Sequence, residues 1–143
     1  MSFQIGVGRW MAVCFGREIS RNKVERNHRF LEEALELVQS LGCAASEAHQ
    51  LVDYTFNRPV GEPAQEVGGV MVTLAALCSA SGLDMAKLGY VELERIWTKV
   101  DSIRAKQAAK PKHGPLPQAW LKRGEVYTHK DGRKGALVGL CAA

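Results

Sequence analysis

The sequence predicts an all-α protein, a bundle of four or five helices that forms oligomers and carries a short C-terminal extension. Three observations support this fold class. Alanine, leucine and glutamate dominate the first two thirds of the chain, and only 7% of all residues are aromatic. Apolar residues recur at helical spacing over several long stretches. Glycines stand just after these stretches, where helices commonly end.

The composition is that of an ordinary globular protein. With 143 residues, 46% of them hydrophobic and 24% charged, the chain can bury a core as one domain. The four cysteines form no C-x-x-C pair, and we recognise no signal peptide. We therefore expect reduced thiols in a cytoplasmic protein. The longest apolar run, residues 67–78, is too short to span a bilayer, and we expect no membrane partner.

The first two predicted helices are separated by a glycine. A short N-terminal helix over residues 3–15 ends at Gly16. Ser20 is a plausible N-cap for the second helix, which runs to about Leu41 and ends at Gly42. The apolar residues of this second helix form one stripe, which predicts that one side packs on the rest of the protein.

Two further helices flank a loop that contains two prolines. Ser46 caps a third, shorter helix over residues 47–56. Residues 57–63 form the loop, and a fourth helix follows from residue 64 or 65 to about residue 81. The second half of this helix is apolar on nearly all sides, which predicts a place at the centre of the bundle.

The last third of the chain combines one helix with a basic extension. Asp84 caps the turn that leads to a fifth helix over residues 90–108. Further on, two β-prone runs flank Asp131 and Gly132, a good turn pair, so the extension could form a β-hairpin. The predicted parts are a helical domain, residues 1–110, and a C-terminal extension, residues 111–143.

The net charge of +4 is unevenly distributed. Basic residues are concentrated between residues 99 and 133, where acids are few. A basic end suits a phosphate-bearing ligand or a nucleic acid. The alternative is a solvated tail without a ligand.

The candidate chemistry lies on three glutamates of the second helix and one of the fourth. Glu33 and Glu36 stand one turn apart, roughly opposite the apolar stripe, and Glu32 precedes them. Glu66 lies in the first turn of the fourth helix, where it also suits the helix dipole. Packing the two helices together would form a three-oxygen site, which favours magnesium over zinc. The alternative is a solvated face, the usual state of glutamate.

Longer strings resemble one enzyme family. They are R-N-H-R-F-L-E-E-A-L-E-L-V-Q at residues 26–39, G-E-P-A-Q-E-V-G-G-V-M-V-T-L-A-A-L-C at residues 61–78 and W-T-K-V-D-S-I-R-A-K-Q-A-A-K-P-K-H-G-P-L-P at residues 97–117. The chain resembles the MazG-like all-α nucleoside triphosphate pyrophosphatases, in particular the phage dATP/dGTP pyrophosphohydrolase branch with the MazZ-type enzymes. The similarity covers about residues 9–118. In the superfamily, E-x-x-E is followed by E-x-x-D, whose final aspartate falls on Gly69 here.

The resemblance implies hydrolysis of a purine nucleoside triphosphate, dGTP foremost, to the monophosphate and pyrophosphate. Glu33, Glu36 and Glu66 would hold Mg²⁺ or Mn²⁺, which neutralises the phosphates and activates a water molecule. Glu32 or Glu33 would accept the proton of that water. Either Glu32 or another carboxylate replaces the missing aspartate, or water fills its place, or activity is lost.

The same resemblance suggests the residues that bind the substrate. Lys99, Arg104 and Lys106 would contact phosphate oxygens, and Trp10 and Asn27 would line the slot for the base. The alternatives are a solvated basic face for the cations and a core position for Trp10. We expect a homo-oligomer, a tetramer rather than a dimer, without a nucleic-acid partner.

A second hypothesis is a helical module without catalytic activity. In it the bundle forms oligomers through the surface of residues 67–77, and the basic tail binds nucleic acid or another partner. Gly69 in place of the aspartate is the sequence feature that favours it.

Overall fold

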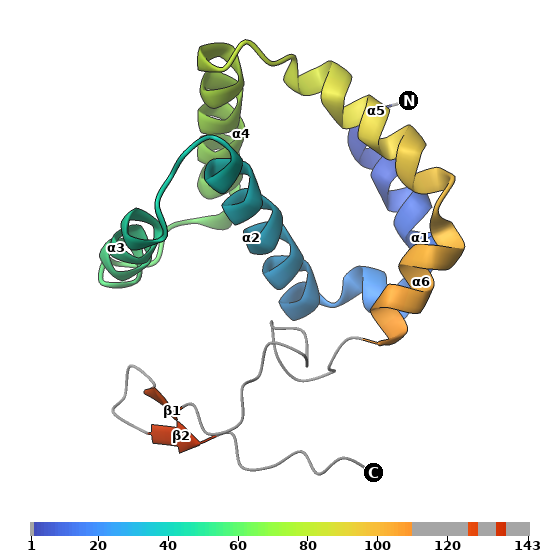
Figure 1. Cartoon of the computed structure of the whole chain (residues 1–143). Coiled ribbons are helices and arrows are strands. Elements are labelled where there is room, and N and C mark those ends of the chain that lie inside the picture. Colours follow the sequence, from blue (N-terminus) through green and yellow to red (C-terminus); the bar gives the residue numbers. More distant parts are fainter. Residues whose placement is uncertain (1, 110–125, 129–133, 137–143) are drawn as a thin grey trace. The chain divides into compact units, whose positions relative to one another are not determined.

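The computed structural model describes residues 2–109, 126–128 and 134–136 (Figure 1). The elements in this part of the chain are α1 (Phe3–Arg21), α2 (Lys23–Ser40), α3 (Ala45–Phe56), α4 (Pro63–Ala80), α5 (Met85–Trp97), α6 (Val100–Ala108), β1 (Val126–Thr128) and β2 (Lys134–Ala136). The chain divides into two compact units, Met1–Ile103 and Arg104–Ala143. The predicted helical class is confirmed for the first unit.

The predicted break at Gly16 is confirmed, but the helix resumes after it. Gly16 has a φ of 75° and a ψ of 175° inside α1, which continues to Arg21. Ser20 does not cap the second helix, because its hydroxyl donates to the carbonyl oxygens of Gly16 and Met11. The N-cap of α2 is Asn22, whose side-chain oxygen accepts from the Glu25 N–H at 3.1 Å.

Replacing Gly16 with alanine is expected to destabilise the protein by about 1–3 kcal/mol, because only glycine adopts this backbone conformation readily. Gly8 is the matched control, since it lies in the regular first part of α1 and a Cβ there meets no atom within 4 Å. Gly8→Ala is expected to stabilise the protein by roughly 0.5–1 kcal/mol. Urea unfolding followed by circular dichroism measures both. Equal effects of the two substitutions would contradict the expectation.

The third helix begins earlier than predicted. Ala44, rather than Ser46, is the N-cap residue of α3. The reason is that the carboxylate of Glu47 reaches back and accepts a hydrogen bond from the Ala44 N–H at 2.7 Å. The predicted ends of the helices before and after this region are confirmed, because Gly42 and Gly82 have φ values of 94° and 66°.

The predicted fifth helix is two helices. Asp84 caps α5 directly, accepting from the Lys87 N–H at 2.9 Å. The first of the two helices ends at Trp97, and α6 starts at Val100. At the break, the Thr98 hydroxyl donates to the Arg95 carbonyl oxygen at 2.7 Å. A threonine that bonds to the preceding turn competes with continuation of the helix, which accounts for the break.

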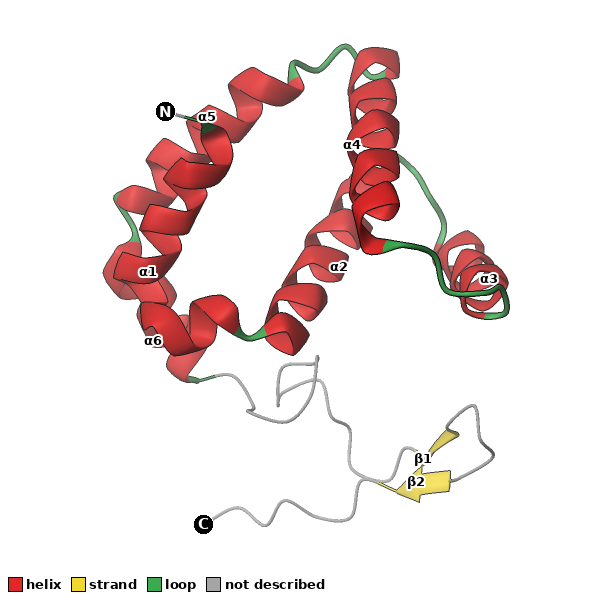
Figure 2. Cartoon of the chain, turned by 180° about the vertical axis from the view of Figure 1, so that it is seen from behind, coloured by secondary structure: helices red, strands yellow, loops and turns green. Residues whose placement is uncertain are grey.

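The core of the first unit joins α1 and α5, which lie side by side in both views (Figures 1 and 2). Trp10, Cys14 and Leu93 are its buried residues. The indole N–H of Trp10 donates to the carbonyl oxygen of Ile96 at 3.2 Å. Half-buried side chains surround this group: Val7, Met11, Phe15, Ile96, Val100 and Ile103. A small core therefore fixes one helix pair.

The helices from α2 to α4 bury almost nothing within the chain. No residue of α2 or α3 is buried, and Cys78 is the buried residue of α4. The side chains of Val67 and Met71 are 61% and 60% exposed. The prediction that α4 occupies the centre of a bundle is therefore wrong within a single chain. Its apolar surface faces outward because, in the part of the chain that the structure describes, no helix covers its first half.

The second unit contains the predicted hairpin strands. β1 pairs with β2 in antiparallel register, with Val126 opposite Ala136. This pairing confirms that the extension holds a β-hairpin. The predicted turn residues, Asp131 and Gly132, lie outside the described residues.

Candidate functional site

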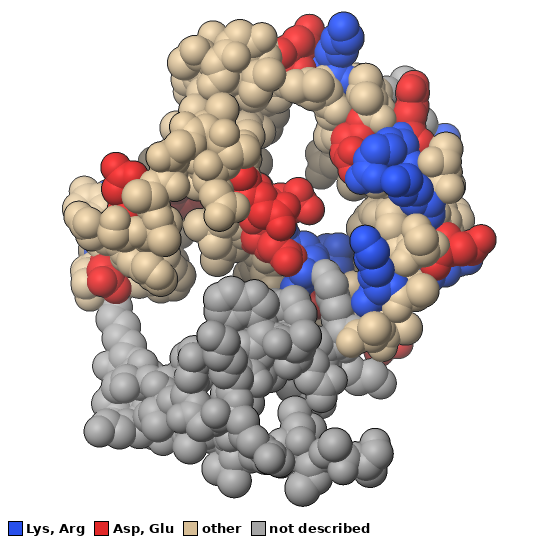
Figure 3. Space-filling model, in the orientation of Figure 1, with Lys and Arg blue, Asp and Glu red and all other residues tan. Residues whose placement is uncertain are grey.

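Three glutamates form what we call the acidic edge of α2: Glu32, Glu33 and Glu36. Glu33 and Glu36 are exposed, and Glu32 is half-buried. Figure 3 shows a group of carboxylates gathered over α2. The i and i+3 spacing places the carboxylates of Glu33 and Glu36 on adjacent turns of one face. The structure therefore presents the predicted carboxylate pair to solvent.

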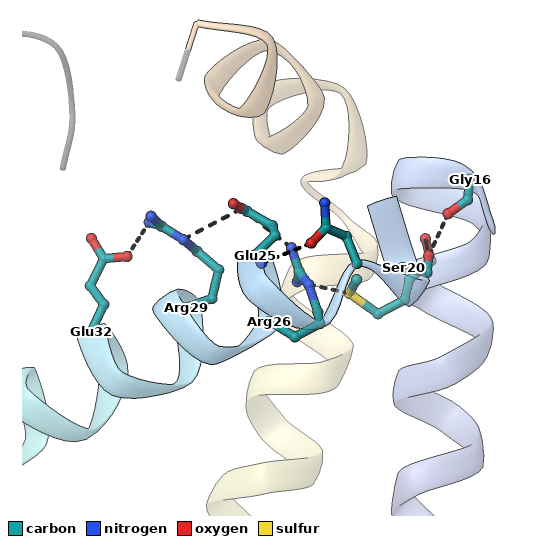
Figure 4. A network of polar contacts seen from close by, with 8 residues as sticks. Gly16, Ser20, Glu25, Arg26, Arg29 and Glu32 are labelled. Atoms are coloured by element: carbon teal, nitrogen blue, oxygen red, sulfur yellow. Dashed lines mark hydrogen bonds and ion pairs between the residues drawn. The ribbon is translucent and has the colours of Figure 1, made fainter. Parts of the chain in front are cut away.

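Two arginines of α2, Arg26 and Arg29, lie before the acidic edge in the sequence (Figure 4). Arg29 lies between two carboxylates, with its Nε 3.5 Å from Glu25 Oε1 and its Nη1 against Glu32. The carboxylate of Glu32 is thus paired and oriented by a cation. Sequence reasoning missed this role of Arg29, although its i+3 spacing to Glu32 is visible in the string R-F-L-E.

Arg26, the first of these two arginines, contacts α1. Its guanidinium carbon lies 5.8 Å from the centroid of the Phe15 ring, and its Nη1 lies 3.7 Å from the sulfur of Met11. Burial lowers the pKa of Arg26, the charge of Glu25 raises it, and the neighbouring Arg29 lowers it. Arg26 therefore contacts two side chains of α1 from the first turn of α2.

A further ion pair, between Arg95 and Glu92, lies on α5. Arg95 donates two hydrogen bonds to Glu92, at 2.6 and 2.5 Å. These bonds raise the pKa of Arg95, and so do the charge of Glu92 and, least, that of Glu33. The same hydrogen bond lowers the pKa of Glu92. Glu92 and Arg95 are thus a paired carboxylate and cation on the surface of α5.

The third predicted metal ligand does not join the acidic edge. The carboxylate of Glu66 folds back over Gly61, in the loop before α4. Among the residues that the structure describes, no three Asp, Glu, His or Cys side chains form a group that could hold a metal ion. Within the described residues the structure does not bring Glu66 to Glu33 and Glu36, so the metal site of these three carboxylates stays a prediction.

Two exposed carboxylates nevertheless suit one kind of metal site. Magnesium in phosphate-transfer sites is commonly bound through one or two carboxylates, with water and substrate phosphates as the other ligands. Glu33 and Glu36 fit this role. At Gly69, where the enzymes that the sequence resembles have aspartate, an added Cβ meets no atom within 4 Å.

The predicted substrate-binding residues have different surroundings. Trp10 is buried in the core, 8% exposed, with its N–H bonded to the backbone. Asn27 is exposed on α2. Lys99 lies in the break between two helices, whereas Arg104 and Lys106 belong to α6 and are exposed. Lys99 and Lys106 therefore do not lie on one continuous helix, as the predicted fifth helix over residues 90–108 implied.

Three further findings concern membrane-spanning helices, the cysteines and the similarity of the chain to known proteins. No single helix in the described residues is long and apolar enough to cross a membrane, and α4 with α5 passes that test only as a pair bent by 101°. Cys14, Cys43 and Cys78 form no disulfide, and Cys141 lies outside the described residues. Comparison of the chain with protein families, with curated proteins and with solved structures finds no match in any of the three.

Proposed function

We propose that this protein is a metal-dependent nucleoside triphosphate pyrophosphohydrolase that converts a purine deoxynucleotide, dGTP foremost, to the monophosphate and pyrophosphate. The observation that carries the proposal is the exposed carboxylate pair Glu33 and Glu36 on α2. Next to this pair on the same helix, Arg29 pairs with Glu32. Carboxylates for a metal beside cations for phosphates are the groups that this hydrolysis requires.

The proposed roles follow from the chemistry of each side chain. Glu33 and Glu36, with Glu66 in the assembled MazG-like bundle, bind Mg²⁺ or Mn²⁺. When bound, the ion neutralises phosphate charge and lowers the pKa of a water molecule. The water oxygen bonds to the α-phosphorus, the bond from that phosphorus to the bridging oxygen breaks, and pyrophosphate leaves. Glu32 or Glu33 accepts the water proton, and Arg29 orients the carboxylate of Glu32.

The substrate residues complete the proposal. Lys99, Arg104 and Lys106 bind phosphate oxygens, and Asn27 binds the base. Trp10 belongs to the core, so its contribution to base binding is through the position of α1. The enzyme works in the cytoplasm as a homo-oligomer, with a tetramer favoured over a dimer.

The direct test mixes the purified full-length chain with each nucleoside triphosphate and either Mg²⁺ or Mn²⁺. Pyrophosphate release, measured enzymatically, is expected for purine deoxynucleotides and to be fastest for dGTP. Chelation of the metal is expected to stop it. If no nucleotide is cleaved with either metal, the proposed function is rejected.

Restoring the family residue at position 69 tests the metal role of α4. Gly69→Asp places a carboxylate one turn after Glu66, and the site has room for it. We expect Mn²⁺ to bind about tenfold more tightly, roughly 1.4 kcal/mol, because the site gains a charged oxygen ligand. Isothermal titration measures the affinity. Gly68→Asp is the matched control, since position 68 is equally open but lies on a different side of the helix. Equal affinities for the two variants would contradict the assignment.

A helical module without catalytic activity is the second candidate. Two observations favour it: Gly69 stands in place of an acid, and the described residues contain no three-ligand metal group. Its signature is DNA binding that weakens as salt rises and is lost when residues 110–143 are removed. Pyrophosphate release that persists in the truncated chain favours the enzyme instead.

A further inference from the structure

Arg29 lies on the same face of α2 as the two carboxylates that carry the proposed function. At about 100° per residue, Arg29, Glu33 and Glu36 fall within about 60° of one another around the helix axis. Arg29 is also one turn from Glu33, at the i and i+4 spacing of neighbouring side chains. This relation depends on one helix alone, so it holds however α2 packs against other helices.

Two carboxylates hold the side chain of Arg29 on this face (Figure 4). Its Nε lies 3.5 Å from Glu25 Oε1, and its Nη1 contacts Glu32. The side chain is 18% exposed. A guanidinium has five N–H donors in a planar fork, so it can keep one carboxylate partner while it exchanges another. Arg29 can therefore keep Glu25 and exchange Glu32 for a different anion.

The chemistry of that anion follows from the neighbouring carboxylates. A magnesium ion bound by one or two carboxylates completes its coordination with water and substrate phosphates. The anion that such an ion brings to Glu33 and Glu36 is therefore a phosphate, which arginine binds through two parallel N–H donors. Lys99, by contrast, lies in the break after α5, so its approach to the acidic edge depends on helix packing. Local geometry alone places Arg29 beside the proposed metal ligands.

An exchange of partners by Arg29 has a consequence for Glu32. In the structure the carboxylate of Glu32 is paired with Arg29, and its side chain is 41% exposed. An ion pair at this degree of exposure contributes little to stability, so a charge-assisted bond from Arg29 to phosphate offsets its loss. Glu32 is then released, next to Glu33, to accept the proton of the attacking water.

We propose that Arg29 binds the phosphate chain of the nucleotide in exchange for Glu32, so that substrate binding frees this carboxylate to act as the base. The inference deepens the proposed function and rests on it, because the phosphate reaches this face of α2 together with the metal ion. No covalent bond forms or breaks in the exchange.

Binding of a nucleotide that cannot be cleaved tests this role without catalysis. The probe is dGTP with an imido group in place of the oxygen between its α- and β-phosphates, titrated calorimetrically into the full-length chain with Mn²⁺. Arg29→Gln is expected to bind the probe at least about tenfold more weakly than the wild type, because charge-assisted bonds to phosphate are lost. The matched control is Lys23→Gln, since Lys23 is an exposed cation of α2 that lies about 120° from Arg29 around the helix. Its affinity is expected to be unchanged.

A double substitution distinguishes the exchange from an ion pair that only stabilises α2. Glu32→Gln removes the competing partner, so it is expected to bind the probe about two- to tenfold more tightly while its rate of dGTP hydrolysis falls. In the variant that combines Arg29→Gln with Glu32→Gln, this gain in affinity is expected to disappear, because no guanidinium remains to be released. A purely stabilising pair would give no gain in affinity from Glu32→Gln.

Arg29→Lys covers the case in which Arg29→Gln does not fold. Lysine keeps the charge but lacks the planar fork, so binding of the probe at least about threefold weaker is expected. Wild-type affinity in a folded Arg29 variant overturns the role of Arg29 and leaves the proposed function standing, and so does a gain from Glu32→Gln that persists without Arg29. A wild-type chain that neither binds the probe nor cleaves dGTP with either metal rejects both.

Discussion

Replacing Glu36 with glutamine is expected to lower the rate of dGTP hydrolysis by at least about 100-fold, or roughly 2.7 kcal/mol. Glutamine has the same shape as glutamate but lacks its negative charge, so the metal loses one of two exposed carboxylates on α2. Pyrophosphate release at saturating Mn²⁺ measures the loss. Thermal unfolding gives an independent readout, because Mn²⁺ is expected to stabilise the wild type but not Glu36→Gln.

The matched control for this experiment is Glu94→Gln. Glu94 is also an exposed glutamate on a helix, but it lies on α5, outside the acidic edge. We expect wild-type activity and wild-type stabilisation by Mn²⁺ in this variant. Unchanged hydrolysis by Glu36→Gln, or an equal loss in both variants, would remove Glu36 from the proposed metal site.

Trp10→Ala is expected to destabilise the fold by about 3–5 kcal/mol, a large fraction of the total stability of a small domain. Trp10 is one of three buried residues in the cluster that joins α1 to α5, and it also donates a hydrogen bond to Ile96. Its removal leaves a cavity and takes away one hydrogen bond from the Ile96 carbonyl, which still accepts from the Lys99 N–H at 3.1 Å. Equilibrium unfolding in urea measures the change.

Trp10→Phe separates packing from hydrogen bonding. Phenylalanine keeps an aromatic ring in the core but cannot donate to the Ile96 carbonyl, so a loss of about 1–3 kcal/mol is expected. A base-binding role would instead raise KM for the nucleotide while leaving unfolding unchanged. Wild-type stability in Trp10→Ala would show that Trp10 is not a core residue.

The helix breaks that glycine marks were predicted well because they depend on neighbouring residues alone. The breaks at Gly16, Gly42 and Gly82 follow from the backbone freedom of glycine, and all three have positive φ. Caps were predicted less well. Asn22 and Ser20 are both good N-cap residues. Asn22 caps α2 because the Ser20 hydroxyl instead donates to the carbonyl oxygens of Gly16 and Met11.

The candidate site was predicted in part. The spacing of Glu33 and Glu36 fixed their position on one helix face, since that relation is local. The place of Glu66 depended on how helices pack, which no local pattern contains. The surroundings of Lys99 depended on the break after Trp97, which was not predicted. The pairing of Arg29 with Glu32 was readable from its spacing but was not singled out.

By itself the sequence determined the helical class, the helix ends next to Gly42 and Gly82 and the acidic edge of α2, because propensity, glycine placement and spacing act over a few residues. Only the tertiary structure decided which apolar faces the chain covers. It buries Trp10 against α5 and leaves the first half of α4 open. The physical reason is that an apolar stripe shows which side chains favour burial, but it does not show which other surface they pack against.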